Sequence, residues 1–147
     1  MGIRSLLAVT AAALALFASV AQAQEVTPEV HPPYTTQTYL YRDSDGPGRM
    51  TIVDLGPAPG GTFDLIRVTL AQNNITYAGS GYSMQISPFN PAEAMFFVLS
   101  DPRNNAYVFS GVLTTGTGGV TGGGTYHAAG SPRWTNAWHI EGVAPAN

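Results

Sequence analysis

The chain has 147 residues, of which only 10% are charged, and its formal charge is −3. That charged fraction is well below the quarter that is typical of globular domains. The six basic residues are scattered singly, which excludes the concentrated basic footprint of a nucleic-acid-binding surface. The sequence contains no cysteine, so disulfides are excluded and packing and backbone pairing must stabilise the fold.

Residues 1–23 have the pattern of a cleavable secretory signal peptide. Arg4 gives a positive start, an uncharged apolar run follows to Val20, and Ala21-Gln22-Ala23 matches the small-x-small cleavage site. The apolar run is shorter than the roughly 20 residues that span a bilayer. We therefore expect export across the inner membrane, to the periplasm or the extracellular space. The 124 residues that remain suit one domain, with five arginines, nine acids and a formal charge of −4.

The first part of this mature chain predicts a lead-in followed by a hairpin. Residues 24–33 contain three prolines and no periodic pattern, so we expect a flexible segment. Residues 34–42 and 49–55 favour strands, and the turn-forming residues 43–48 between them predict a hairpin with a six-residue loop. The glycine- and proline-rich residues 56–61 then end the second strand.

Residues 62–86 predict a second hairpin whose register can be read from the sequence. Asn73-Asn74 lies at its centre, and asparagine tolerates the positive φ angles of a two-residue hairpin turn. Gln72 then pairs with Ile75, and Leu70 faces Tyr77.

In this register the apolar side of the ribbon changes with distance from the turn. Ile66, Val68 and Leu70 share one side near the turn, whereas Leu65 and Tyr82 lie on the other side further away. We therefore predict a ribbon that bends at residues 79–81 and exchanges its buried side midway. The alternative is that Gly79-Ser80-Gly81 is itself a turn between two short strands.

The remaining residues predict one helical turn and several more strands. Asn90-Pro91-Ala92-Glu93 has the composition of a helix start, which gives the option of one short helical turn near residues 91–95 before the apolar run 94–99. Strands are predicted at 106–115, 125–128 and 133–143, with turns at 102–105 and at Gly118-Gly119. Residues 144–147 are expected to form a short tail.

Together these runs predict an all-β domain at residues 34–143. The economical architecture is a single small antiparallel barrel or crossed-sheet sandwich of about eight strands. An outer-membrane barrel is the alternative, but its strands have about ten residues with an unbroken lipid-facing alternation. The runs at 49–55 and 94–99 are shorter and the glycine-rich residues 111–124 lack that alternation. We therefore expect no stable membrane insertion of the mature chain.

The sequence contains no catalytic or metal-binding signature. Ser80 lies between two glycines, but without the Gly-x-Ser-x-Gly spacing of a nucleophile elbow. His139 and Glu141 are two residues apart on one strand face, yet His127 falls roughly 13 Å from His139, so no third ligand converges. We predict no catalytic residues, no metal and no cofactor. Acids that are distant in sequence can still meet in the fold, which leaves a hydrolase open.

Aromatic side chains are the remaining candidates for binding. Trp134 and Trp138 share a predicted strand face with Ile140, and Tyr39 and Tyr41 share another. Such rows bind sugars or partner chains, but they also fill cores. The candidate binding residues are Trp134, Trp138, Tyr39, Tyr41 and Tyr126.

These patterns favour an exported, non-catalytic binding or interaction module. Its partner would be a small apolar or glycan ligand, or an envelope or secreted protein, and no nucleic acid is expected. The alternatives are a small secreted hydrolase that uses unidentified acidic residues, and an assembly or coat subunit.

Overall fold

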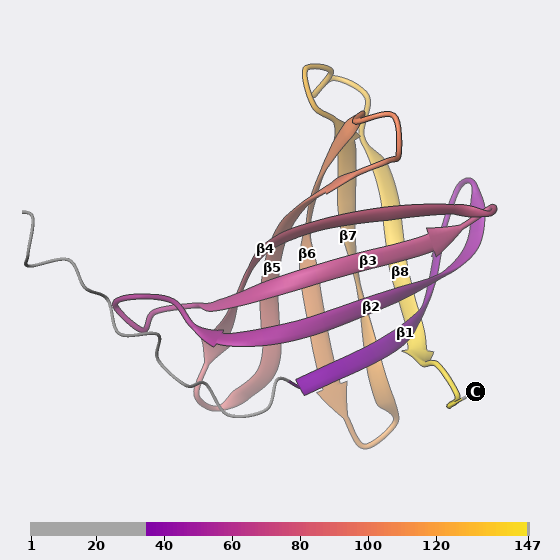
Figure 1. The fold of residues 1–147 in the computed structure, drawn as a ribbon. Helices are drawn as coiled ribbons and strands as arrows, with labels where there is room; N and C mark the ends of the chain where they lie inside the picture. Colours follow the sequence, from indigo (N-terminus) through magenta and orange to yellow (C-terminus); the bar gives the residue numbers. More distant parts are fainter. Residues whose placement is uncertain (1–34, 147) are drawn as a thin grey trace, which may run out of the picture. The chain divides into compact units, whose positions relative to one another are not determined.

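The computed structural model describes residues 35–146, which form a closed antiparallel β-barrel (Figure 1). Its eight strands follow one another around the wall in chain order. They are β1 (Thr35–Asp43), β2 (Gly46–Pro57), β3 (Asp64–Gln72), β4 (Ile75–Ser87), β5 (Asn90–Ser100), β6 (Ala106–Gly116), β7 (Gly119–Ala128) and β8 (Asn136–Val143). The prediction of an all-β domain of about eight strands is confirmed.

Pairing between the first and last strands decides between a barrel and a sandwich. β1 pairs with β2 along one edge and with β8 along the other, so the hydrogen-bond ladder has no open edge. In Figure 1, β1 to β3 run across the front and β6 to β8 run steeply behind them. This crossing is expected in a small barrel, because closure requires the strands to tilt relative to the axis.

The predicted helical turn near residues 91–95 is wrong, because Asn90–Ser100 is one continuous strand, β5. The side chain of Asn90 does accept a hydrogen bond from the backbone N–H of Ala92, at 3.1 Å, as a helix-capping residue would. No helix follows this bond. Beyond it, Met95, Phe97 and Leu99 are buried while the residues between them are more exposed. This period of two is possible only in an extended chain.

Two predicted turns differ from the structure in length or position. Asp43 pairs with Gly46, so the turn between β1 and β2 has two residues, Ser44 and Asp45, rather than six. Gly116 pairs with Gly119, so the turn between β6 and β7 lies one residue earlier than the predicted Gly118-Gly119. The last strand starts at Asn136 rather than at residue 133.

The predicted register of the β3–β4 hairpin is confirmed, but the predicted exchange of buried sides is wrong. Gln72 pairs with Ile75 and Leu70 with Tyr77. Side chains on the interior face stay there along the whole ribbon, and Leu65 and Tyr82 remain on the outer face, where they are exposed. A closed barrel has one interior, so its strands alternate inward and outward without exchange.

Glycines on the interior face make room for large aromatic side chains. Trp138, Phe97 and Phe109 form the centre of the core, with ring centroids 6.2 Å apart for Trp138–Phe97 and 5.0 Å for Phe97–Phe109. A Cβ added at Gly111 would lie 2.5 Å from Cζ2 of Trp138, and one at Gly81 would clash with the Phe96 carbonyl. The glycine-rich segment 111–124 therefore packs the core as well as forming a hairpin.

Several predictions fall outside the described residues or at their end. The predicted signal peptide (1–23), the lead-in (24–33) and His31 lie outside the described residues. At the other end, Ala144 donates its backbone N–H to the Thr38 carbonyl at 2.8 Å, so the start of the predicted tail is attached to β1. The described part of the chain has no helix long and apolar enough to cross a membrane.

Candidate functional site at the open end of the barrel

The interior stripe of several strands ends in a polar residue. In β2, Met50 and Ile52 are followed by Asp54, and in β5 Glu93 precedes Met95 on the same face. Both of these ends lie at one mouth of the barrel, Asp43 and Gln72 lie at the other mouth, and the middle is apolar. The core aromatics fill that middle and separate two interior cavities.

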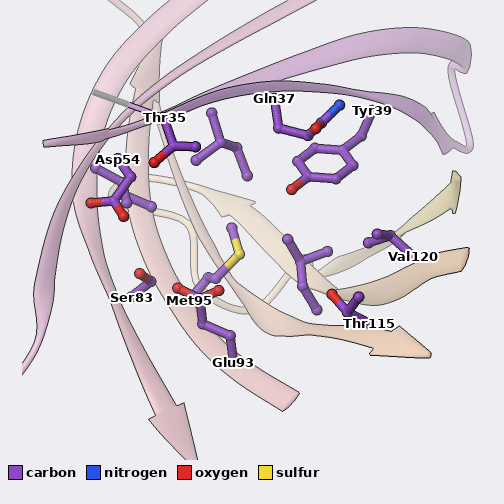
Figure 2. Close-up of a pocket in the computed structure, with 12 residues that line it drawn as sticks. Thr35, Gln37, Tyr39, Asp54, Ser83, Glu93, Met95, Thr115 and Val120 are labelled. Atoms are coloured by element: carbon purple, nitrogen blue, oxygen red, sulfur yellow. The ribbon is translucent and has the colours of Figure 1, made fainter. Parts of the chain in front are cut away.

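The larger cavity lies at the end where β1 begins and β2 ends, and we call it the open-end cavity (Figure 2). Its volume is about 400 Å³, within the range of small-molecule sites. Its apolar wall is formed by Ile52, Ile66, Met95, Leu113 and Val120. Its polar groups come from β1, β2, β4, β5 and β6 and are Thr35, Gln37, Tyr39, Asp54, Ser83, Glu93 and Thr115.

The charged side chains of the open-end cavity are both carboxylates. Asp54 and Glu93 both line the open-end cavity (Figure 2). Asp54 uses Oδ1 to accept the backbone N–H of Gly56 at 2.8 Å, which fixes its orientation. Burial, and then the charge of Glu93, raise the pKa of the Tyr39 hydroxyl, and both residues line the cavity. The cavity therefore has a negative potential.

Ser83 is the most buried polar residue of this cavity. It is 3% exposed and stands opposite Met95 in the β4–β5 ladder. Its side chain lines the cavity (Figure 2), and its hydroxyl makes no hydrogen bond to another described residue. Among the described residues no fully buried side-chain N or O atom lacks a partner, so this unpaired oxygen is accessible from the cavity and available to a ligand.

The smaller cavity, of about 140 Å³, lies at the opposite end and is organised by Asp43. Oδ2 of Asp43 accepts the hydroxyls of Tyr41 at 2.8 Å and Tyr126 at 3.1 Å, and Oδ1 accepts Nε2 of Gln72 at 2.7 Å. Burial is the main cause that raises the pKa of both tyrosines, and Asp43 adds to it. The volume of this cavity is below the usual range for ligand sites, and hydrogen bonds join Asp43 to Tyr41, Tyr126 and Gln72, so we call these four residues the Asp43 plug.

The structure places the five predicted binding residues in three different environments. Trp138, Tyr41 and Tyr126 lie at the core and the Asp43 plug, and Tyr41 and Trp138 stack with centroids 6.3 Å apart. Tyr39 lines the open-end cavity. Trp134 precedes β8 in the connecting loop and is 80% exposed, so its predicted face shared with Trp138 is wrong.

Of the residues that line the open-end cavity, the sequence analysis predicts only Tyr39 as a binding residue, and it misses the two acids, Asp54 and Glu93. The sequence does contain a signal for these two acids. Each occupies the next inward-facing position after a row of apolar residues, at the end of its strand. The expected helix start at residues 90–93 conceals the signal at Glu93, because a helical turn there would interrupt the alternation of β5.

An exposed apolar surface covers part of the outer wall. The rings of Phe63 and Tyr82 are 5.2 Å apart, and those of Tyr82 and Phe96 are 5.5 Å apart. Exposed side chains around them on β3 to β6 extend this surface: Leu65, Met84, Val98 and Val112. Exposed patches of this kind occur at contact sites between proteins.

The polar outer face around β8 does not assemble a metal site. His139 Nε2 lies 3.4 Å from Glu141 Oε1, and the same oxygen receives Nε of Arg42 at 2.8 Å. The guanidinium of Arg42 and the His139 ring lower the pKa of Glu141, with the hydrogen bond from Arg42 as the main cause. Among residues 35–146 no group of three or more His, Asp or Glu side chains is placed to hold a metal ion.

Comparison with protein-family models, with curated proteins and with solved structures finds no match for this chain. The barrel and its open-end cavity are therefore the observations from which a function can be inferred.

Proposed function

We propose that this chain is an exported, non-catalytic binding module that holds a small ligand in the open-end cavity of its barrel. The single observation that carries the proposal is the cavity of about 400 Å³ with an apolar wall and a ring of polar groups. Sites for small molecules combine these features, because the apolar wall supplies affinity and the few polar groups fix orientation. The signal-like pattern of residues 1–23 supports export to the periplasm or the extracellular space.

The described side chains supply a reason to favour binding over nucleophilic catalysis. The polar groups of the cavity include hydroxyls, one amide and two carboxylates, but no histidine that could activate Ser83 or a threonine. The barrel wall is also continuous, so these groups are held on rigid strands.

The test is a binding screen read at the cavity itself. Neither tryptophan lines the open-end cavity, so the methionine methyl groups are better reporters: Met95 lines it and Met84 is exposed on the outer wall. With ¹³C-methyl methionine, alkyl glycosides, fatty acids and short glycans are titrated into the protein. We expect one class to shift the Met95 signal and leave Met84 unchanged.

A cavity-filling variant controls the screen. Val120→Trp places a large side chain in the cavity, whereas Val112→Trp places the same side chain on the outer wall. Binding lost in the first variant and kept in the second supports the proposal. If every compound leaves Met95 unmoved, or if Val120→Trp binds as well as the parent, small-ligand binding at this site is overturned.

A second candidate is a small hydrolase, which is favoured by the presence of Asp54 and Glu93 in one cavity. Pairs of carboxylates are the catalytic groups of most glycoside hydrolases. Chromogenic glycosides test it directly. Turnover that is lost in both Asp54→Asn and Glu93→Gln would replace the binding function by catalysis, and absence of turnover in the parent protein would remove this candidate.

A further inference from the structure

We propose that the open-end cavity selects a small organic cation, an ammonium group on an apolar body, through Asp54 and Glu93. This inference rests on the proposed function, ligand binding in the same cavity, and adds the chemical class of the ligand. Three independent features of the cavity support it.

The first feature is the sign of the interior charge. The charged residues that line the open-end cavity, Asp54 and Glu93, are acids, and those of the smaller cavity, Asp43 and Asp45, are acids too. The five arginines of residues 35–146 line neither interior cavity. An anion entering this end would meet two like charges without a compensating base, whereas an ammonium group would be attracted to both carboxylates.

The second feature is the free hydrogen-bonding capacity of Ser83. This residue is 3% exposed, and its hydroxyl is accessible from the cavity and has no partner among residues 35–146. Ser83 lies on β4, next to the strand that carries Glu93. An ammonium group has three donors, so it can bind a carboxylate and a hydroxyl oxygen together.

The third feature is the apolar wall, which distinguishes an organic cation from a metal ion. Ile66, Met95 and Leu113 form the inner part of the cavity and offer no ligand that a hard cation prefers. Burial of an aliphatic or aromatic body against them is favourable in proportion to the apolar area removed from water. The thioether of Met95 also favours contact with an aromatic ring.

The experiment compares three probes that share one body and differ in charge: 3-phenylpropylammonium, 3-phenylpropan-1-ol and 3-phenylpropanoate. Each is titrated into the full chain by calorimetry and by the methionine methyl spectrum. We expect the cation to bind about tenfold more tightly than the alcohol, as one charge-assisted hydrogen bond allows. The anion should bind more weakly than the alcohol. Of the three affinities, added sodium chloride should lower only that of the cation.

Carboxamide variants assign the effect to the two acids. Asp54→Asn and Glu93→Gln should each lower the affinity for the cation about tenfold and leave the alcohol unchanged. Asn at position 54 keeps an oxygen for the Gly56 N–H, so the strand end is preserved. Glu141→Gln removes a carboxylate from the outer face and is the matched control, for which we expect no change.

The outcomes separate this inference from the proposed function. If the alcohol and the cation bind with equal affinity and both shift the Met95 signal, the small-ligand function is kept and the proposed selection of a cation is overturned. A cation that shifts Met84 and not Met95 also overturns it, because the contact is then on the outer wall. If none of the three probes binds, the cation inference fails, and the wider ligand screen decides the proposed function independently. The comparison of probes uses the parent protein, so it stands even if a variant does not fold.

Discussion

Single glycines decide how the largest side chain of the core is accommodated. Trp138 is 1% exposed, and its Nε1 donates to the Thr125 carbonyl at 3.3 Å. Gly111 and Gly124 are paired on the neighbouring strands, and Gly124 pairs with Trp138 itself. Side chains at these two positions would occupy the space that the indole and the adjacent backbone fill. In packing of this density an extra methyl group must displace its neighbours.

We predict that Gly111→Ala lowers the free energy of unfolding by about 1–3 kcal/mol, the usual cost of overpacking a core. The reason is that the new Cβ would lie 2.5 Å from both Trp138 Cζ2 and the Gly123 carbonyl oxygen. The measurement is urea denaturation at neutral pH. Gly116→Ala, on the same strand with no neighbouring atom within 4 Å of the new Cβ, is the control. Equal stability of the two variants would contradict the packing argument.

At the scale of the element, the β3–β4 hairpin is set by its two-residue turn. Asn73 and Asn74 have φ angles of 51° and 61°, which are the positive values of a type I′ turn. Asn73 also donates Nδ2 to the Asp45 carbonyl at 3.1 Å, which joins this hairpin to the β1–β2 turn. The turn therefore fixes both the register of one hairpin and its contact with the next.

We predict that Asn74→Val lowers the free energy of unfolding by about 1–2 kcal/mol, because a β-branched residue is strained at positive φ. Asn74→Gly should be as stable as the parent or slightly more stable, since glycine adopts this conformation without strain. Thermal unfolding followed by circular dichroism measures both. Thr76→Val adds the same side chain to the exposed face of β4 and should change little. A tolerated valine at position 74 would show that the turn does not set the register.

At the scale of the whole domain, the Asp43 plug couples β1, β3 and β7. Tyr41, Gln72 and Tyr126 come from these three strands and donate to the same carboxylate. The backbone N–H of Asp45 donates to it as well, at 2.8 Å. Because burial and Asp43 raise the pKa of both tyrosines, the folded barrel holds their protons more tightly than the unfolded chain does.

We predict that the free energy of unfolding is unaffected by these tyrosines below about pH 10, the ordinary tyrosine pKa, and falls as the pH rises above it. Each hydroxyl that stays protonated only in the folded state contributes a slope of about 1.4 kcal/mol per pH unit. Urea midpoints between neutral and alkaline pH measure this slope. Tyr41→Phe and Tyr126→Phe should each reduce it, whereas Tyr82→Phe, which alters an exposed residue of the outer wall, should not. A parent protein whose stability does not change above pH 10 would contradict the coupling.

Local signals in the sequence were sufficient to predict the approximate positions of the strands and the register of one hairpin. Asn73-Asn74 gave the register of β3 and β4, because the positive φ that a two-residue turn needs restricts the residues that can form it. The β-favouring composition of the other runs gave strands within about four residues of their observed ends, except for β7, which begins at Gly119 rather than at residue 125. The turn residues also separated most of them correctly, since turn chemistry acts within the turn itself.

Only the tertiary structure decided which face of each strand is interior and which polar residues share a cavity. The exchange of sides in residues 62–86 was predicted because Leu65 and Tyr82 are apolar, yet closure of β1 on β8 places both outside. Closure also brings Asp54 and Glu93 from β2 and β5 into one mouth. Hydrophobicity reports which side chains avoid water, but inward and outward are defined only once the ladder has closed.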